Sequence, residues 1–248
     1  MEAAGRTADV DAYLKWAADQ RLTVVRVLVM AKHLFVLPPD RGLAALDPFL
    51  ARAARHRIHV EIVALADTAE YPVDLKAHVR RVGEIAAKHP NAFVEIANEP
   101  YHATQAEPVR DPRFLAELRK EIPSPVLVAL GAAPDPELYT EGDYVTYHSS
   151  RSPAEKGWGH VRDIRRQAPE FLKRARKPLV DDEPIGAGER FDQGRRDDSP
   201  ERFHAHAQAA KQAGLYSTFH YEGGLQARIP AGRELECFLA WRRGLEDQ

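Results

Sequence analysis

The sequence predicts an α/β fold of the (β/α)8-barrel, or TIM-barrel, type. Short runs rich in Val, Ile, Phe and Tyr alternate with longer amphipathic stretches, and most successive runs begin about 35 residues apart, the size of one strand-helix unit. Such a repeat implies a parallel sheet with right-handed crossovers. The chain has 248 residues, and a barrel typically takes about 250. A doubly wound sheet fits less well, because no glycine-rich phosphate loop follows Met30.

The predicted strands have the length and the β-branched or aromatic composition of buried strands. They cover residues 23–30, 58–66, 92–98, 125–130, 143–148, 178–182 and 216–220.

Helices are predicted where apolar residues recur every three or four positions. Asp111 and Ser199 each stand before a proline and mark helix starts, and Gly214 marks a helix end. The predicted helices cover residues 10–20, 43–56, 75–89, 112–120, 161–175, 200–213 and 233–244, with a reduced helix at 135–141.

Composition excludes several classes of function. The net charge is −2, with 35 basic and 37 acidic residues, which gives no global reason to bind nucleic acid or a membrane. The single cysteine, Cys237, excludes an intrachain disulfide framework and a multi-cysteine zinc site. We expect one domain over residues 1–248. Residues 1–20 do not resemble a signal peptide, so localisation stays open between the cytoplasm and secretion within a longer precursor.

Two glutamates follow predicted strands, and each stands before a proline. Glu99 follows the run 92–98, and Glu183 follows the run 178–182. Carboxylates at strand ends can face each other across a barrel mouth, and at a separation of about 5–5.5 Å they can perform retaining glycoside hydrolysis. Glu222 is the rival of Glu183, although its neighbours Gly223 and Gly224 indicate a loop.

Several motifs resemble the (β/α)8 glycoside hydrolase clan that includes cellulases and β-mannanases. Asn98-Glu99-Pro100, with Glu95 upstream, resembles the end of the clan's fourth strand. Arg26 matches the arginine of its second strand, His148 the histidine that ends its sixth, and Glu183 the glutamate of its seventh. The matches occur in the clan's order along the chain.

The resemblance implies a retaining β-glycoside hydrolase that acts on an oligo- or polysaccharide. Glu99 would be the general acid/base and Glu183 the nucleophile. Asn98 would bind the sugar 2-hydroxyl, Arg26 would hydrogen-bond Glu183, and His148 would line the site near it. The resemblance implies no metal and no cofactor.

The sequence departs from the clan at three places. Ser150 stands where a tyrosine often contacts the nucleophile, and Tyr221 stands near the position of the usual sugar-platform tryptophan. Trp158, after the sixth strand, is a second candidate for stacking on sugar. The first strand is missing, because a helix precedes the strand that carries Arg26. A missing strand leaves sheet edges at 23–30 and 216–220, which predicts low solubility or a homo-oligomer.

Two other functions remain open, and three features have non-catalytic interpretations. The departures also fit a non-catalytic carbohydrate-binding relative, and widely separated glutamates would favour a barrel enzyme of another class, such as a lyase or isomerase. Asp181 and Asp182 are interpreted as loop residues or partners of arginines. His204 and His206, two apart on a helix, are interpreted as a solvated face rather than a metal pair. Residues 186–199 are a candidate surface lid.

Overall fold

The structure is a computed structural model that describes residues 1–33, 35–132, 136–148, 161–184, 186–187 and 199–247. Within these ranges every strand pair is parallel, apart from an isolated antiparallel bridge between Ala31 and Leu37. The chain forms two compact units. Unit 1 comprises Met1–Ala132 with Leu138–Asp143, and unit 2 comprises Ala133–Glu137 with Tyr144–Gln248. The α/β class is confirmed, and the expectation of a single domain stays a prediction.

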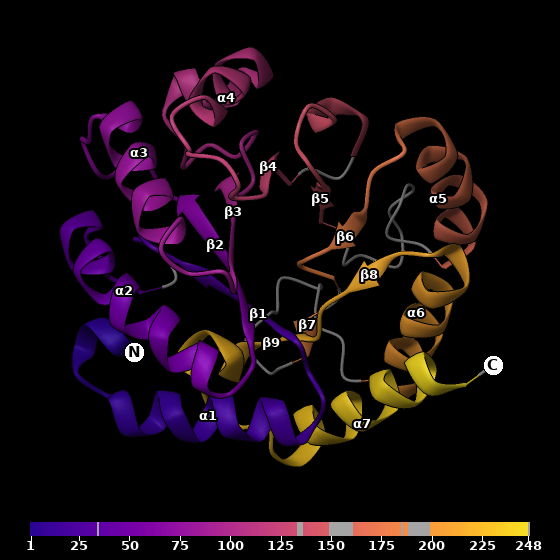
Figure 1. The fold of residues 1–248 in the computed structure, drawn as a ribbon. Coiled ribbons are helices and arrows are strands. Elements are labelled where there is room, and N and C mark those ends of the chain that lie inside the picture. Colours follow the sequence, from indigo (N-terminus) through magenta and orange to yellow (C-terminus); the bar gives the residue numbers. More distant parts are fainter. Residues whose placement is uncertain (34, 133–135, 149–160, 185, 188–198, 248) are drawn as a thin grey trace. The chain divides into compact units, whose positions relative to one another are not determined.

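Unit 1 contains a parallel sheet whose order follows the chain, β1-β2-β3-β4. No strand precedes β1 in residues 1–23, which are all described, so the predicted absence of a first strand is confirmed. Helices α2, α3 and α4 lie in order beside the strands (Figure 1). The elements are η1 (Glu2–Ala4), α1 (Thr7–Asp19), β1 (Val24–Leu28), α2 (Pro39–Arg55), β2 (His59–Leu65), α3 (Leu75–Ala86), β3 (Ala92–Ala97), η2 (Glu107–Arg110), α4 (Pro112–Arg119) and β4 (Val128–Gly131).

Local sequence signals explain where these helices begin. The Asp74 carboxylate accepts a hydrogen bond from the Ala77 amide at 3.0 Å, and Asp111 caps α4 through the Arg113 amide at 2.9 Å. Helix α2 starts at Pro39, earlier than predicted, because a proline at the first helical position has no amide hydrogen to leave unsatisfied.

The two faces of the β1–β4 sheet carry different residues. Arg26, Glu61 and Phe93 are register partners and therefore share one face, on which Glu95 follows Phe93 by two positions. The alternate positions carry aliphatic side chains, which form the core with the helices. That core includes Val60, Ile62, Val94, Ile96 and Val128 from the strands and Leu46, Leu50, Val79, Val82, Leu115 and Leu118 from the helices, all buried.

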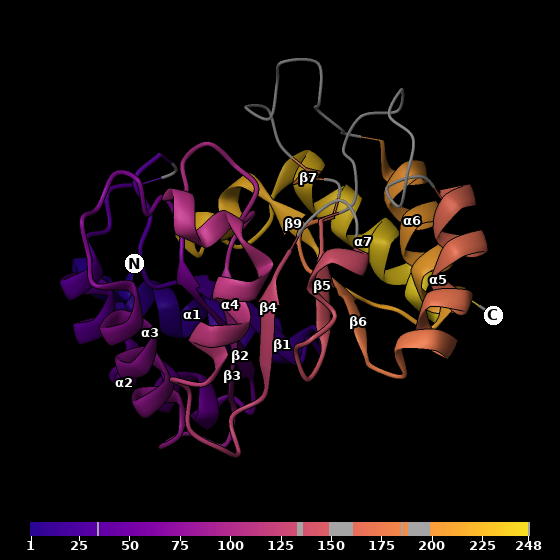
Figure 2. The same ribbon diagram turned by 90° about the horizontal axis from the view of Figure 1, so that it is seen from above.

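Unit 2 contains a second parallel sheet, ordered β5-β6-β8, and a short parallel pair of β7 and β9. Helices α5 and α6 lie side by side, as do α6 and α7, in both views (Figures 1 and 2). The elements are β5 (Val145–Tyr147), α5 (Val161–Ala175), β6 (Leu179–Asp181), β7 (Gly186–Ala187), α6 (Pro200–Ala213), β8 (Tyr216–Ser217), β9 (His220–Tyr221), η4 (Glu222–Gln226) and α7 (Gly232–Glu246). The reduced helix expected at 135–141 is the 3-10 turn η3 (Pro136–Tyr139), which joins the units.

The predicted strand 216–220 is divided into β8 and β9. The Thr218 amide donates to the Asp181 carbonyl and its hydroxyl to the Asp182 carbonyl, while Thr218 and Phe219 belong to neither strand. Phe219 then packs among aromatic rings of α6 and α7, with centroids 5.7 Å from Phe203 and 5.2 Å from Phe238. These contacts between distant segments have no signal in the local sequence. The partner strand β7 lies in the segment predicted as a lid, whose residues 188–198 fall outside the described ranges.

Among the described helices, none has both the length and the apolar character needed to cross a bilayer.

Gly42 lets helix α2 lie against the end of β1. A Cβ on Gly42 would stand 1.6 Å from the Val29 carbonyl oxygen, so Gly42→Ala forces the backbone apart. We expect this change to lower the free energy of unfolding by about 1–3 kcal/mol, despite the higher helix propensity of alanine. Urea denaturation measures the loss.

Ala44→Gly is the matched control, because Ala44 is exposed on the same helix. It should cost about 1 kcal/mol through helix propensity alone. A Gly42→Ala protein more stable than wild type would contradict the close packing of α2 on β1.

Candidate functional site

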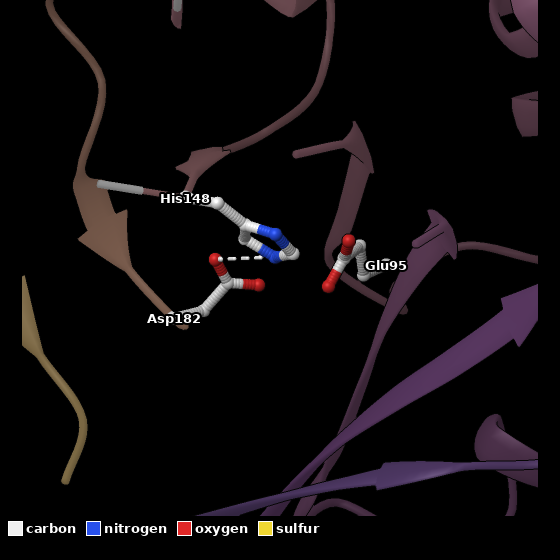
Figure 3. Close-up of side chains that lie close together, drawn as sticks. All are labelled: Glu95, His148 and Asp182. Carbon is white, nitrogen blue, oxygen red and sulfur yellow. Dashed lines mark ion pairs between the residues drawn. The ribbon is translucent and has the colours of Figure 1, made fainter. Parts of the chain in front are cut away.

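A buried ion pair joins strands β1 and β3 of unit 1. The Arg26 side chain donates from Nε to Glu95 Oε2 at 2.9 Å, and one terminal nitrogen lies 2.8 Å from the same oxygen. Arg26 also donates to Asn98 Oδ1 at 2.8 Å. Glu95, whose side chain is drawn in Figure 3, is fully buried, so a cation is needed to offset its desolvation. Arg26 therefore fixes both Glu95 and the amide of Asn98.

Glu99 begins a tight turn directly after β3. Its φ is +40°, an uncommon value for a residue with a side chain and one that clusters at functional sites. The His102 amide donates to the Glu99 carbonyl at 2.8 Å, which places Pro100 and Tyr101 at the centre of the turn. The Tyr101 hydroxyl donates to Glu99 Oε1 at 3.0 Å. Both the backbone and the carboxylate of Glu99 are therefore held.

Gly131, the last residue of β4, makes room for this turn. A Cβ there would stand 2.6 Å from Pro100 Cγ and 2.8 Å from the Ala97 carbonyl oxygen. The absence of a side chain lets the turn lie against the strand end.

Gln105 fastens the same loop to the end of β2, a role that no sequence motif signals. Its amide nitrogen donates to the Asn98 carbonyl, and its oxygen accepts from the Thr68 hydroxyl at 2.7 Å. The Thr68 hydroxyl oxygen in turn accepts from the Ala106 amide at 2.7 Å. Gln105 and Thr68 are buried, so these bonds are shielded from water.

Asp67, after β2, organises the neighbouring loop. Its Oδ2 accepts from the Lys32 amide at 2.7 Å and from the His33 amide at 3.0 Å. Burial favours the neutral carboxyl, but these two bonds and one to Thr104 outweigh burial and lower the pKa of Asp67 below its ordinary value. Asp67 is therefore ionised and anchors the chain that follows β1.

In unit 2, His148 lies between two carboxylates. Its Nε2 is 3.6 Å from Asp182 Oδ1 and 3.6 Å from Glu183 Oε2, distances of ion pairs rather than of direct hydrogen bonds. Figure 3 shows His148 and Asp182 turned toward each other from β5 and β6. The structure thus places the predicted site residues His148 and Glu183 together.

Strand alternation separates Asp181 from its neighbour Asp182. Asp181 shares a face with its register partner Tyr147, in the core covered by α5 and α6, and its Oδ2 lies 2.9 Å from His206 Nε2 of α6. Burial, and then the negative charge of Asp181 and the hydrogen bond to it, hold the pKa of Tyr147 well above its usual value.

Two expectations for these side chains are wrong. Asp181 and Asp182 are buried and lie beside histidines, so they are not solvated loop residues. His206 is also buried and does not belong to a solvated face, because α6 turns it toward the sheet. His204 is half-buried and pairs with Asp247 at 2.7 Å.

Tyr221 is a packing residue rather than an open aromatic platform. Its ring is buried, stacks on Phe219 with centroids 5.3 Å apart, and meets Gly224, where a Cβ would approach it to 2.9 Å. Its hydroxyl donates to the Arg228 carbonyl. A sugar cannot stack on a ring held in this way, so Tyr221 does not enter the site that we describe below.

The remaining predictions are not tested within either unit. Trp158 and Ser150 lie outside the described residues, as does the side chain of Glu222. Glu99 belongs to unit 1 and Glu183 to unit 2, so the pairing of their carboxyls, and the bond of Arg26 to Glu183, stay predictions.

Comparisons with known proteins bear on the fold. No family model matches the chain, and no curated protein matches its sequence. A family 5, subfamily 18 glycoside hydrolase from Bifidobacterium longum subsp. infantis matches in structure with a TM-score of 0.65 and 12% identity, over 96% of this chain and 73% of that chain. A variant of a subfamily 18 protein from Streptomyces cattleya, in complex with Manb1-4GlcNAc, matches with a TM-score of 0.64 and 14% identity, over 96% and 76%.

An endo-beta-1,4-mannanase from Thermotoga petrophila also matches, with a TM-score of 0.61 and 14% identity. The match covers 86% of this chain and 63% of the mannanase, so the chain spans less than two thirds of that protein. These likenesses establish the fold, which is of the (β/α)8-barrel type found in family 5 glycoside hydrolases. The resemblance indicated by the strand-end motifs is confirmed at the level of the fold.

The lowered pKa of Asp67 makes stability depend on pH in one direction. The unfolded chain binds a proton near pH 3.9 and the folded chain only at lower pH, so the stabilisation is present above about pH 4 and is lost as pH falls through the folded pKa. We expect Asp67→Asn to destabilise the protein at pH 7 and the difference from wild type to shrink at pH 3.

Urea midpoints at pH 7, 5 and 3 measure this effect. Glu107→Gln, at an exposed carboxylate, serves as the control and should leave the midpoint unchanged at each pH. If Asp67→Asn lowers the urea midpoint by the same amount at pH 7 and at pH 3, the charge of the carboxylate contributes nothing to stability.

Proposed function

We propose that the protein is a retaining β-glycoside hydrolase that cleaves O-glycosidic bonds of an oligo- or polysaccharide by double displacement. The observation that carries this proposal is the end of β3, where Glu99 stands in a strained turn and Asn98 is fixed by the Arg26–Glu95 pair. The similarity of the fold to family 5 glycoside hydrolases supports it. One of those neighbours is solved with a bound disaccharide, Manb1-4GlcNAc, which supports a carbohydrate ligand.

Glu99 acts as the general acid and then as the general base. In the first step the Glu183 carboxylate bonds to the anomeric carbon while the bond from that carbon to the leaving oxygen breaks, and Glu99 gives its proton to that oxygen. In the second step Glu99 takes a proton from water, whose oxygen bonds to the anomeric carbon and displaces Glu183. The cycle returns both carboxyls to their starting states.

Glu183, rather than its acidic neighbours, is the nucleophile. Its side chain is 19% exposed, whereas the side chains of Asp181 and Asp182 are 0% exposed. A nucleophile must reach the anomeric carbon, and only Glu183 of these three presents accessible surface. His148 lies beside it, with Nε2 3.6 Å from Glu183 Oε2.

Asn98 binds the 2-hydroxyl of the sugar. Because Arg26 donates to Asn98 Oδ1, the amide is oriented with Nδ2 as the group that donates to a ligand. Hydrogen bonds at the 2-hydroxyl strengthen in the transition state. Trp158 remains a candidate for stacking on sugar, on sequence grounds.

A non-catalytic carbohydrate-binding protein is the second candidate. Ser150, in place of the tyrosine that commonly contacts the nucleophile, favours it. The Glu99 carboxylate at the end of β3 favours the enzyme, since general acid-base catalysis needs a carboxyl held at the strand end.

Replacing either catalytic carboxyl should remove turnover without unfolding the protein. Glu99→Gln should lower kcat/KM on an unactivated β-linked oligosaccharide at least about a hundredfold, because general acid-base catalysis contributes about 10²–10⁴. Glu183→Gln should abolish turnover, because the carboxylate that bonds to the anomeric carbon in the first step is gone. Glu107→Gln, at an exposed acid, is the control and should keep wild-type activity. Unchanged activity in Glu183→Gln would rule out its assignment as nucleophile.

The stereochemical outcome and covalent trapping separate the enzyme from the binding protein. Proton NMR of the first product should show retained β configuration, and a 2-fluoro β-glycoside with an activated leaving group should label Glu183, as identified by mass spectrometry. Oligosaccharide binding by calorimetry without labelling or turnover would support the non-catalytic alternative. An inverted product would exclude the double displacement.

A further inference from the structure

Tyr101 is the exposed aromatic residue of the Glu99 turn, and neither sequence pattern nor fold assigned it a role. The hydrogen bond from the His102 amide to the Glu99 carbonyl closes the turn, and Pro100 presets its backbone. This geometry returns the Tyr101 side chain toward the residue two positions earlier, where its hydroxyl donates to Glu99 Oε1 at 3.0 Å. The residue is 45% exposed, in reach of a ligand at the strand end.

We propose that Tyr101 is a positioning residue for the proton transfer at Glu99, an inference that rests on the proposed function. A phenol that donates to Oε1 occupies that oxygen, so the transferable proton is carried by Oε2. The same bond persists after Glu99 has lost its proton, and it is then stronger, because its acceptor is charged. Tyr101 thus keeps one defined oxygen aimed at the glycosidic bond in the first step and at water in the second.

The surroundings of Glu99 explain why the carboxyl needs such a partner. Its backbone is fixed by the turn, by Gly131 below Pro100 and by Gln105 on the Asn98 carbonyl. A fixed backbone does not by itself fix the side-chain torsions, and rotation about them would exchange the oxygen that faces the substrate. The hydroxyl of Tyr101 restricts that rotation from within the same turn.

The test uses leaving groups of different basicity with wild type and Tyr101→Phe, which removes the hydroxyl and keeps the ring. With phenyl β-glycoside, whose leaving group needs a proton, we expect kcat/KM to fall about tenfold, a fraction of the contribution of general acid catalysis. With 2,4-dinitrophenyl β-glycoside, which departs without a proton, kcat/KM should change less than about twofold. A general structural defect would lower both rates equally.

Tyr216→Phe is the matched control, because Tyr216 is 65% exposed on β8 and outside the proposed machinery. It should leave both values of kcat/KM at the wild-type level. Equal losses of kcat/KM on the two glycosides in Tyr101→Phe, or no loss on either, would overturn the positioning role.

A second measurement does not depend on turnover. In protein labelled with ¹³C at the glutamate carboxyls, with the Glu99 signal assigned through Glu99→Gln, the pKa of Glu99 should rise by about half a unit or more in Tyr101→Phe, because a bond to the ionised form is lost. His102, the other titratable group of the turn, binds the Thr104 hydroxyl through Nδ1 and is present in both proteins, so it contributes equally.

An unchanged pKa of Glu99 overturns the inference whatever the activity. A wild-type protein without hydrolase activity overturns the proposed function and with it the catalytic role of Tyr101. An active wild type whose Tyr101→Phe variant behaves identically overturns only the role of Tyr101. The two failures are therefore distinguishable.

Discussion

The buried Arg26–Glu95 ion pair is the constraint on which the strand-end site of unit 1 depends. A guanidinium and a carboxylate removed from water cost several kcal/mol each unless their geometry repays it. Here Arg26 contacts Glu95 through two nitrogens and uses a terminal nitrogen to hold Asn98. Arg26 therefore neutralises the buried charge of Glu95 and also orients the amide of Asn98, which is proposed to bind the ligand.

The turn after β3 extends that order to the carboxyl of Glu99. Several contacts act on the turn at once: Gly131 leaves space for Pro100, Gln105 ties the Asn98 carbonyl to the neighbouring loop, and the Glu99–His102 bond closes the turn. Together they sustain a backbone conformation at Glu99 that would be unfavourable in isolation. The strand provides rigidity, and the loop carries the carboxyl proposed as the acid/base.

The acidic run that ends β6 shows how a parallel strand distributes adjacent charges. Alternation sends Asp181 toward α6 and Asp182 toward His148, and Glu183 comes after the strand, where its side chain is partly exposed. The His206–Asp181 pair lies on the helix-covered face and ties α6 to β6. Glu183, the proposed nucleophile, is therefore the one of the three consecutive acids with an accessible side chain, while the other two lie beside histidines.

The sequence by itself determined the strand-helix repeat, most element boundaries, the missing first strand and the location of the candidate carboxyls at strand ends. These properties follow from periodicity, caps and local motifs, which act over a few residues. Tertiary structure decided which side chains meet. The Arg26–Glu95 ion pair joins residues far apart in the chain, and so does the hydrogen bond between Gln105 and Thr68.

Burial is the second property that the sequence could not supply. His206, Asp181 and Asp182 look like solvated residues in a linear reading, because charged side chains are usually exposed. Only the packing of α6 on β6 and the register of β5 with β6 show that they are paired inside unit 2. The division of the last predicted strand has the same cause, since Phe219 leaves the sheet to join the aromatic rings of α6 and α7. Desolvation and packing depend on neighbours distant in sequence, and those neighbours exist only in the folded chain.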